Sequence, residues 1–303
     1  MRFLLTDPYA SLDCETTSAN PEEAQVVDIA LALIRPGEQP ELRSATVDPG
    51  VEVPDEAAKI HGFTTERVRA EGKPAPEVLD GFLSDIAAVV RDGWPLLIQN
   101  APYDATVLDH EAARHHLEPL ASRLGGAPLH IVDTLCLDKR LIKFRKRVSP
   151  TQGARQLKTL AAVYGIPWDD ALAHGAGYDA MQAARVGWRM AQWCSFNRDQ
   201  LAALRVGPFD PPKPMHRNDV AGFLAVGRMS PAELHAAQVG WAREQADNFA
   251  DWLRQNAHEA LHRSEVAEDD AEREIFAKDA ADLFDKANGV SGEWPVRSPV
   301  ATS

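Results

Sequence analysis

The chain has 303 residues, of which 45% are hydrophobic, and its formal net charge is -13. This length allows one sizeable domain with an extension, or two domains. The negative charge argues against a protein that coats nucleic acid through its overall field, but it permits a metal-filled acidic pocket with a small basic rim. The three cysteines are odd in number and lack C-x-x-C spacing, which argues against a disulfide scaffold or a zinc site. With no signal peptide and no membrane-length apolar run, the sequence predicts a soluble cytoplasmic protein.

The part of the chain before residue 200 predicts an α/β fold. Apolar runs bounded by turn residues predict strands at residues 9–15, 26–34 and 42–47, and their short connections predict an antiparallel meander. Two further strands are predicted at residues 96–98 and 129–135. Helices are predicted at residues 54–60, 64–71, 76–91, 102–116, 157–164 and 177–193. A meander followed by helix-linked strands predicts a mixed sheet flanked by helices.

A proline-rich stretch at residues 206–215 marks a predicted domain boundary. We therefore divide the chain into an α/β domain at residues 1–197, a linker at 198–218 and a helical, acidic extension at 219–303. Within the extension, an amphipathic pattern predicts a helix at residues 229–255. The acidic run at residues 265–274 predicts a solvated face or a loose segment, and the tail is expected to dock through Trp294.

Four acidic side chains and one histidine stand at the ends of predicted elements. Asp13 and Glu15 alternate at the end of the first strand, so they emerge on one face, whereas Cys14 points into the packing. The other three lie in the first turns of two helices or just before one, namely Asp104, His174 and Asp179. Each residue taken alone also has a non-functional explanation, as part of a solvated strand end, as a surface histidine or as a helix cap. Together they offer the carboxylate oxygens that hard divalent cations prefer.

The spacing of these residues resembles the motifs of one enzyme family. The motifs are Asp13-Cys14-Glu15-Thr16, Ile60-His61-Gly62-Phe63-Thr64, Asn100-Ala101-Pro102-Tyr103-Asp104, Val132-Asp133-Thr134, and His174 followed five positions later by Asp179. Over about residues 8–195 the chain is similar to the DEDDh family of 3'→5' exonucleases, which includes the proofreading subunit of bacterial DNA polymerase III. The departures, Pro102-Tyr103 and a glycine-rich third motif, remove no catalytic side chain.

This resemblance implies a ribonuclease H-like fold and a set of residue roles. It implies two divalent ions, Mg²⁺ or Mn²⁺, held by Asp13, Glu15, Asp104 and Asp179. It implies His174 as the general base, because a neutral imidazole accepts a proton near neutral pH. It also implies that the nucleic acid contacts Thr16, His61 and Asn100.

Positive charge is concentrated in one run. The run comprises Lys139, Arg140, Lys143, Arg145, Lys146 and Arg147, followed by Arg155 and Lys158. It is either a solvated loop or a rim that holds the phosphates of a single strand, in which we include Lys143, Arg145, Lys146 and Arg147.

The resemblance predicts an enzyme that trims the 3' end of DNA, single-stranded DNA above all, in proofreading or repair. An RNA-trimming exoribonuclease is the alternative within the class, because no motif reports contacts to a 2'-hydroxyl. A catalytically silent nucleic-acid or polymerase-binding module is the alternative outside it, although a binder has no need of His174. A DNA polymerase or a sliding clamp is a further expected partner. Residues 200–204 resemble a clamp-docking peptide or, equally, one turn of an amphipathic helix.

Overall fold

The computed structural model describes residues 1–143, 145–207 and 213–297, and its centre is a six-stranded mixed sheet. The strands are β1 (Tyr9–Thr16), β2 (Val26–Ile34), β3 (Glu41–Asp48), β4 (Lys73–Pro74), β5 (Leu96–Ile98) and β6 (Ile131–Asp133), in the order β4-β3-β2-β1-β5-β6. The first three strands pair antiparallel, as the short connections predicted. β5 runs parallel to β1, and β6 parallel to β5. The predicted α/β class and the meander are therefore confirmed.

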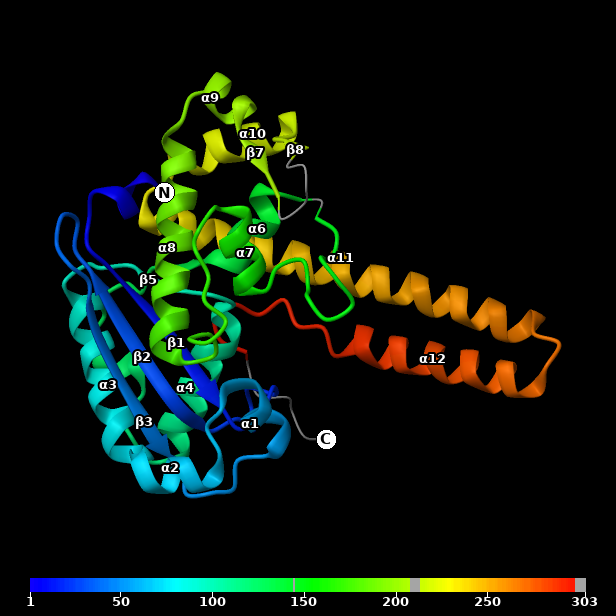
Figure 1. Cartoon of the computed structure of the whole chain (residues 1–303), viewed down its shortest axis with the longest axis horizontal. Helices are drawn as coiled ribbons and strands as arrows, with labels where there is room; N and C mark the ends of the chain where they lie inside the picture. Colours follow the sequence, from blue (N-terminus) through cyan, green and yellow to red (C-terminus); the bar gives the residue numbers. More distant parts are fainter. Residues whose placement is uncertain (144, 208–212, 298–303) are drawn as a thin grey trace.

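Helices cover both faces of this sheet (Figure 1). The first of them are the 3₁₀ helix η1 (Arg2–Leu5), α1 (Asp55–His61), α2 (Thr65–Glu71), α3 (Ala75–Arg91), α4 (Ala101–Arg114), α5 (Leu120–Arg123), α6 (Thr134–Leu141), α7 (Leu157–Val163) and α8 (Ala176–Ser195). Side chains alternate across a strand, so Leu97 of β5 packs with α8, whereas Leu96 and Ile98 pack with α3 and α4. A Cβ at Gly187 would lie 2.2 Å from the Leu97 side chain, so glycine there permits the close approach of α8 to the sheet.

The predicted strand at residues 129–135 is wrong at its end. β6 stops at Asp133, and α6, which the sequence pattern did not predict, begins at the next residue. The Asp133 carboxylate accepts hydrogen bonds from the backbone N–H groups of Leu135 (2.9 Å) and Cys136 (3.0 Å). Aspartate in this capping position accepts hydrogen bonds from backbone N–H groups that a helix start leaves free. The chain therefore changes from strand to helix at Asp133.

The C-terminal helices extend further than the sequence pattern predicted. They are α9 (Arg198–Ala203), α10 (Arg217–Val226), α11 (Pro231–Val266) and α12 (Asp270–Asn288), with a short antiparallel pair of β7 (Arg205–Val206) and β8 (Lys213–Pro214) between the first two. α11 continues past residue 255, and Asp269 caps α12 within the acidic run at residues 265–274. Of the two alternatives predicted for this run, the solvated face is confirmed and the loose segment is wrong. α11 and α12 form an antiparallel hairpin that projects from the body (Figure 1).

The first part of α11 seals the edge of the sheet. The buried amide of Gln238 donates to the carbonyl of Ile131 (2.7 Å) and accepts from the N–H of Asp133 (2.8 Å). His235 Nδ1 accepts a third bond, from the N–H of Ile131 (3.0 Å). Within the described residues no strand pairs with β6 on this side, so these two side chains satisfy backbone groups that an edge strand leaves exposed.

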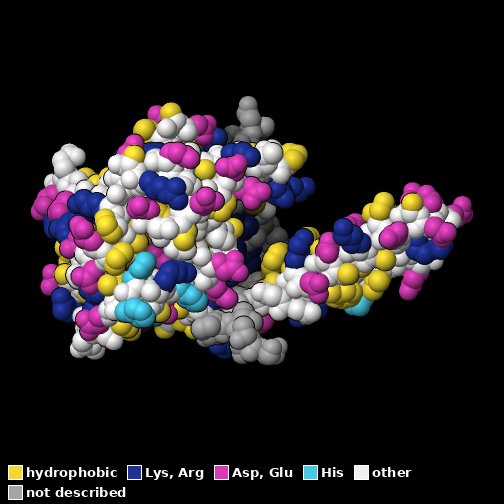
Figure 2. All heavy atoms as spheres, turned by 90° about the horizontal axis from the view of Figure 1, so that it is seen from below, with side chains coloured by type: hydrophobic (Ala, Val, Ile, Leu, Met, Phe, Trp, Pro, Cys, Tyr) yellow, Lys and Arg dark blue, Asp and Glu magenta, His cyan; other side chains and the backbone are white. Residues whose placement is uncertain are grey.

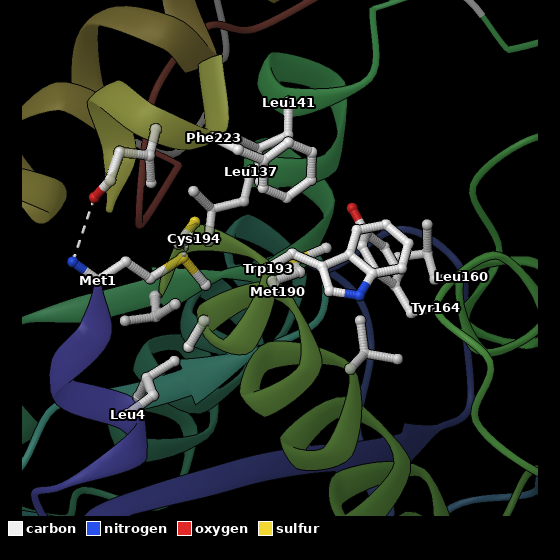
Figure 3. Packing of buried hydrophobic residues seen from close by; sticks show 14 of the residues in the cluster. Met1, Leu4, Leu137, Leu141, Leu160, Tyr164, Met190, Trp193, Cys194 and Phe223 are labelled. Carbon is white, nitrogen blue, oxygen red and sulfur yellow. Dashed lines mark hydrogen bonds between the residues drawn. The ribbon is translucent and has the colours of Figure 1, made fainter. Parts of the chain in front are cut away.

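α10 shares a core with the α/β part (Figure 3). The Trp193 ring of α8 packs against Tyr164 at 4.8 Å and against Phe223 of α10 at 5.7 Å between ring centroids. The amino group of Met1 donates to the carbonyl of Val226 at 3.2 Å. The linker predicted at residues 198–218 thus separates segments of different composition, but the hydrophobic core continues from one side of it to the other. None of the helices in the described part of the chain has the length and apolarity that crossing a membrane requires.

Candidate active site

The predicted carboxylates meet at one end of the sheet. Asp13 and Glu15 leave β1 where it pairs with β2 on one side, and α4 begins after the parallel neighbour β5 on the other. The Asp104 carboxylate, on the first turn of α4, accepts a hydrogen bond from the backbone N–H of Cys14 at 3.0 Å. This bond ties α4 to the strand between the two β1 carboxylates, while the Cys14 side chain is buried as predicted.

α8 brings the remaining two residues to the same place. Glu15, His174 and Asp179 each offer one ligand atom, and these three atoms lie within 4.8 Å of one another. His174 has φ +62°, and this left-handed backbone turns the chain into α8, whose first turn carries Asp179. The histidine is exposed, and the aspartate is nearly buried. We call Asp13, Glu15, Asp104 and Asp179 the carboxylate cluster.

Burial is the largest cause that raises the pKa of each member of the cluster. It raises the pKa of Glu15 to about 9, that of Asp104 to about 7 and that of Asp179 to about 6. The pKa of Asp13 is raised well above its ordinary value, by burial first and then by the neighbouring carboxylates. Four acids that cannot all ionise together need either protons or cations between them.

The chemistry of this donor set fits a divalent metal. Asp179 Oδ1 is buried without a hydrogen-bond partner, which is costly unless something else satisfies it. The carboxylate oxygens of the cluster suit hard cations such as Mg²⁺ or Mn²⁺, and the His174 imidazole lies beside them. The cluster could hold such ions between β1, α4 and α8.

The raised pKa values predict how metal and pH act on stability. Unfolded carboxyl groups titrate near pH 4, so between about pH 4 and 9 the carboxylate cluster of the metal-free fold binds more protons than the same residues in the unfolded chain. The contribution of the cluster to stability therefore falls as the pH rises through that window. We expect a lower melting temperature at pH 8.5 than at pH 5.5 in EDTA. Saturating Mn²⁺ should add about 2.7 kcal/mol at one hundred times its Kd at pH 8.5, and much less at pH 5.5. Calorimetry checks this, and equal stabilisation at both pH values would contradict it.

A fifth carboxylate, Asp28, was missed by the sequence analysis. It lies opposite Glu15 in the β1–β2 register, and its Oδ2 accepts a hydrogen bond from the backbone N–H of Ala176 at 3.0 Å. Burial raises the pKa of Asp28 to about 6. It fixes the start of α8, and therefore the place of Asp179, relative to β2. An aspartate inside an otherwise apolar strand was the pattern that could have revealed it.

A cleft of about 820 Å³ opens beside Glu15 and is lined by Thr16 and His61, two predicted nucleic-acid contacts. His61 Nδ1 accepts from the N–H of Phe63 (3.1 Å), so its Nε2 donates to the carbonyl of Thr16 (3.1 Å). Burial lowers the pKa of His61, which favours this neutral form. The Thr16 hydroxyl is hydrogen bonded to that of Tyr103, which the sequence analysis had not assigned to the site. The two predicted contacts thus form one wall.

Asn100, the third predicted contact, lines a neighbouring cleft of about 320 Å³. Its backbone has φ +67°, and its N–H donates to the carboxylate of Asp133 at 3.2 Å. The indole N–H of Trp294 donates to the same carboxylate at 3.1 Å. The predicted docking of Trp294 is confirmed, and the tail lies close to the start of α4.

The predicted basic rim divides into two parts. Lys143, Lys146 and Arg147 are exposed. The Arg145 side chain is only 3% exposed, and its guanidinium donates to the buried carboxylate of Asp138 at 2.7 Å. This ion pair gives Arg145 a structural contact in place of a free positive charge.

Substitutions should separate the two parts of the rim. Replacing both Lys146 and Arg147 by alanine should lower the slope of log affinity against log salt for a single strand by about 1.4, which corresponds to two lost phosphate contacts. Arg145→Ala should instead lower the free energy of unfolding by about 1 to 3 kcal/mol, because the buried Asp138 carboxylate loses one of its two ion-pair partners and keeps Arg155. Salt titrations and denaturant unfolding measure the two effects, with Lys278→Ala on α12 as control. An unchanged salt slope in the Lys146/Arg147 variant would exclude those residues from the rim.

Comparison with known proteins shows which solved structures and which sequence family the chain resembles. Among solved structures, it resembles zinc-bound E. coli exonuclease I in complex with single-stranded DNA (16% identity, TM-score 0.49) and exonuclease I from Methylocaldum szegediense (19% identity, TM-score 0.49). Each match covers 61% of this chain and 40% of the nuclease chain, so the chain spans less than half the length of those nucleases. No curated protein matches the sequence. The sequence model of the exonuclease family matches residues 11–186. That match covers more than half of the chain, which therefore belongs to the exonuclease family, as its motifs predicted.

Proposed function

We propose that the chain is a divalent-metal-dependent 3'→5' exonuclease that removes nucleotides from the 3' end of single-stranded DNA. The observation that carries this proposal is the convergence of Glu15, His174 and Asp179 within 4.8 Å, beside buried Asp104 and the raised pKa of Asp13. Three separate segments supply these residues, and the cluster has no structural ion pair to explain it among the described residues. A hydrolytic site explains why such a repulsive arrangement is retained.

Each residue has a role in hydrolysis of the terminal phosphodiester. Two bound divalent ions would neutralise the phosphoryl oxygens and stabilise the attacking and leaving oxygens. The carboxylate cluster holds them, with Asp28 fixing the relation of α8 to β2. His174, exposed beside Glu15 and Asp179, accepts the proton of the attacking water and passes it to solvent.

The cleft at Thr16 and His61 suits the terminal nucleoside. It adjoins Glu15, and its walls carry hydroxyl and carbonyl groups that pair with sugar oxygens. Ile60 also lines it, with 62% of its surface exposed, and so offers an apolar face to a base. A strand end held there places its last phosphodiester at the carboxylate cluster. The cluster lies largely below the surface, which favours an unpaired end over one held in a duplex.

A nuclease assay tests the proposal directly. The full chain is incubated with 3'-labelled single-stranded DNA, duplex DNA or single-stranded RNA, in Mg²⁺, in Mn²⁺ or in EDTA. We expect mononucleotide release from single-stranded DNA, fully dependent on the metal. Faster release from RNA would replace the DNA substrate by RNA. A folded, metal-loaded protein that binds strands but releases no nucleotide would support the binding-module alternative instead.

Trimming during proofreading or repair, next to a DNA polymerase or a sliding clamp, is the matching cellular role. The segment at residues 200–204 gives this role little support as a clamp-docking peptide. Leu201 is fully buried in α9, and the Gln200 side chain accepts a hydrogen bond from the N–H of Asn197 in a capping box. The helical interpretation of the segment is therefore favoured.

A further inference from the structure

A second groove lies between α6 and α11, away from the carboxylate cluster. The two helices lie side by side in Figure 1, and Gln245 of α11 donates to the carbonyl of Cys136 of α6 at 3.1 Å. The groove has a volume of about 680 Å³. The wall that the α/β part contributes to the groove is basic and carries Lys139, Arg140, Lys143 and Arg155. The α11 wall presents Glu244, Gln245, Asn248, Phe249 and Trp252.

Two aromatic side chains on α11 lie exposed in this groove. Phe249 and Trp252 are 51% and 55% exposed, and both lie on the part of the hairpin next to the body. Their ring centroids are 5.9 Å apart and the ring planes differ by 12°, so the faces are parallel. The hairpin leaves them uncovered, although burying such rings would be favourable. Exposed aromatic faces beside positive charge are the feature on which single-stranded bases stack.

The charges of the groove match a polyanion. Among the described residues, Lys139, Arg140 and Lys143 have no carboxylate within ion-pairing distance, and the Arg140 guanidinium lies over the Trp241 ring at 5.4 Å. Arg155 is committed to Asp138 at 3.1 Å, so three cations remain against the single carboxylate of the groove, Glu244. In a chain of net charge -13, this local excess of positive charge favours a ligand that carries phosphates. An acidic protein surface would match the charge, but it would not need the exposed aromatic rings.

A second cleft lies between this groove and the start of α4. It is the smaller cleft at Asn100, and it shares Lys139, Gln245 and Phe249 with the groove. That cleft reaches Pro102, which stands on the first turn of α4 together with Asp104. A strand can therefore run from the carboxylate cluster, past the start of α4, to the aromatic pair. Figure 2 shows the hairpin projecting beside a face of the body where histidine side chains gather.

We propose that this groove binds the single strand on the 5' side of the scissile bond, with bases stacked on Phe249 and Trp252 and phosphates held by Lys139, Arg140 and Lys143. The inference rests on the proposed function for its substrate, a single-stranded nucleic acid. It adds a binding surface from α11, which lies outside residues 11–186 that the family covers. The hairpin then serves to retain a long strand while its 3' end is shortened.

Binding measurements that vary strand length test the groove. Fluorescence anisotropy in EDTA compares labelled oligothymidylates of about 3 and 20 nucleotides. Lengthening should tighten binding to the native chain, and Phe249→Ala with Trp252→Ala should weaken binding of the long strand about 5- to 100-fold more than that of the short one. Trp188→Ala removes a half-exposed indole from α8 and should preserve the gain with length. An unchanged gain in the double variant, or equal loss on both strands, would overturn the proposal.

Crosslinking of the native chain gives a second test that does not depend on variants. A single strand carrying 5-iodouracil at successive positions is irradiated with the protein, and crosslinked peptides are mapped by mass spectrometry. Crosslinks at Phe249 or Trp252 from interior positions are expected, and crosslinks confined to other segments would exclude the groove. Nucleotide release by the same preparation tests the proposed function separately. Binding through the aromatic pair without any release would keep the groove and reject the exonuclease.

Discussion

Asp179→Asn is expected to abolish metal-dependent nucleotide release, and Asp13→Asn to do the same. Each change removes an anionic ligand while keeping the size of the side chain. The loss of several kcal/mol of transition-state stabilisation corresponds to a fall in turnover of at least about a thousandfold. Turnover of a 3'-labelled single strand in Mn²⁺ measures it. Asp109→Asn, on the exposed side of α4, is the matched control and should retain full activity.

The same two variants carry an opposite prediction for stability, which separates lost chemistry from lost folding. Burial and mutual repulsion raise the pKa of Asp13, and burial raises that of Asp179 to about 6, so each ionised group is unfavourable in the metal-free fold. An uncharged amide removes this cost above about pH 6, and the metal-free melting temperature should rise. Mn²⁺ should then stabilise the variants less than the native chain. A lower melting temperature in EDTA would mean that the carboxylates support the fold rather than the metal.

His174→Ala should lower turnover by roughly two to four decades, the usual contribution of a general base. The alanine side chain cannot accept the proton of the attacking water, so the chemical step slows. Turnover at saturating Mn²⁺ between pH 6 and 8 measures the loss. His110→Ala on α4 is a control of the same residue type outside the cluster. A variant with near-full rate across this range would contradict the assignment of His174 as the base.

Much of the fold follows from local sequence. β2 and β5 occupy the predicted residues, because an apolar run flanked by turn residues has few other ways to bury itself. The convergence of Glu15, His174 and Asp179 could also be expected, because each stands where a strand ends or a helix begins. Two of the predicted contacts, Thr16 and His61, share one cleft.

Other features depend on contacts that no local pattern reports. The partner of Arg145 is Asp138, yet inside a run of cations Arg145 resembles its exposed neighbours. α12 begins within an acidic run because Asp269 caps it and α11 packs along it, and that packing is invisible from composition. Phe249 and Trp252 lie within the amphipathic helix predicted at residues 229–255, and the projection of the hairpin leaves them exposed. These are all cases where a distant segment decides the environment of a residue.

The bonds from His235 and Gln238 to β6 have a practical consequence for truncated proteins. A fragment cut back to residues 11–186, the part that the family model covers, would lack both side chains and leave the outer edge of β6 bare. Unpaired strand edges recruit other chains, so such a fragment should aggregate even with its catalytic residues in place. A soluble minimal nuclease made from this chain must therefore retain the first turns of α11.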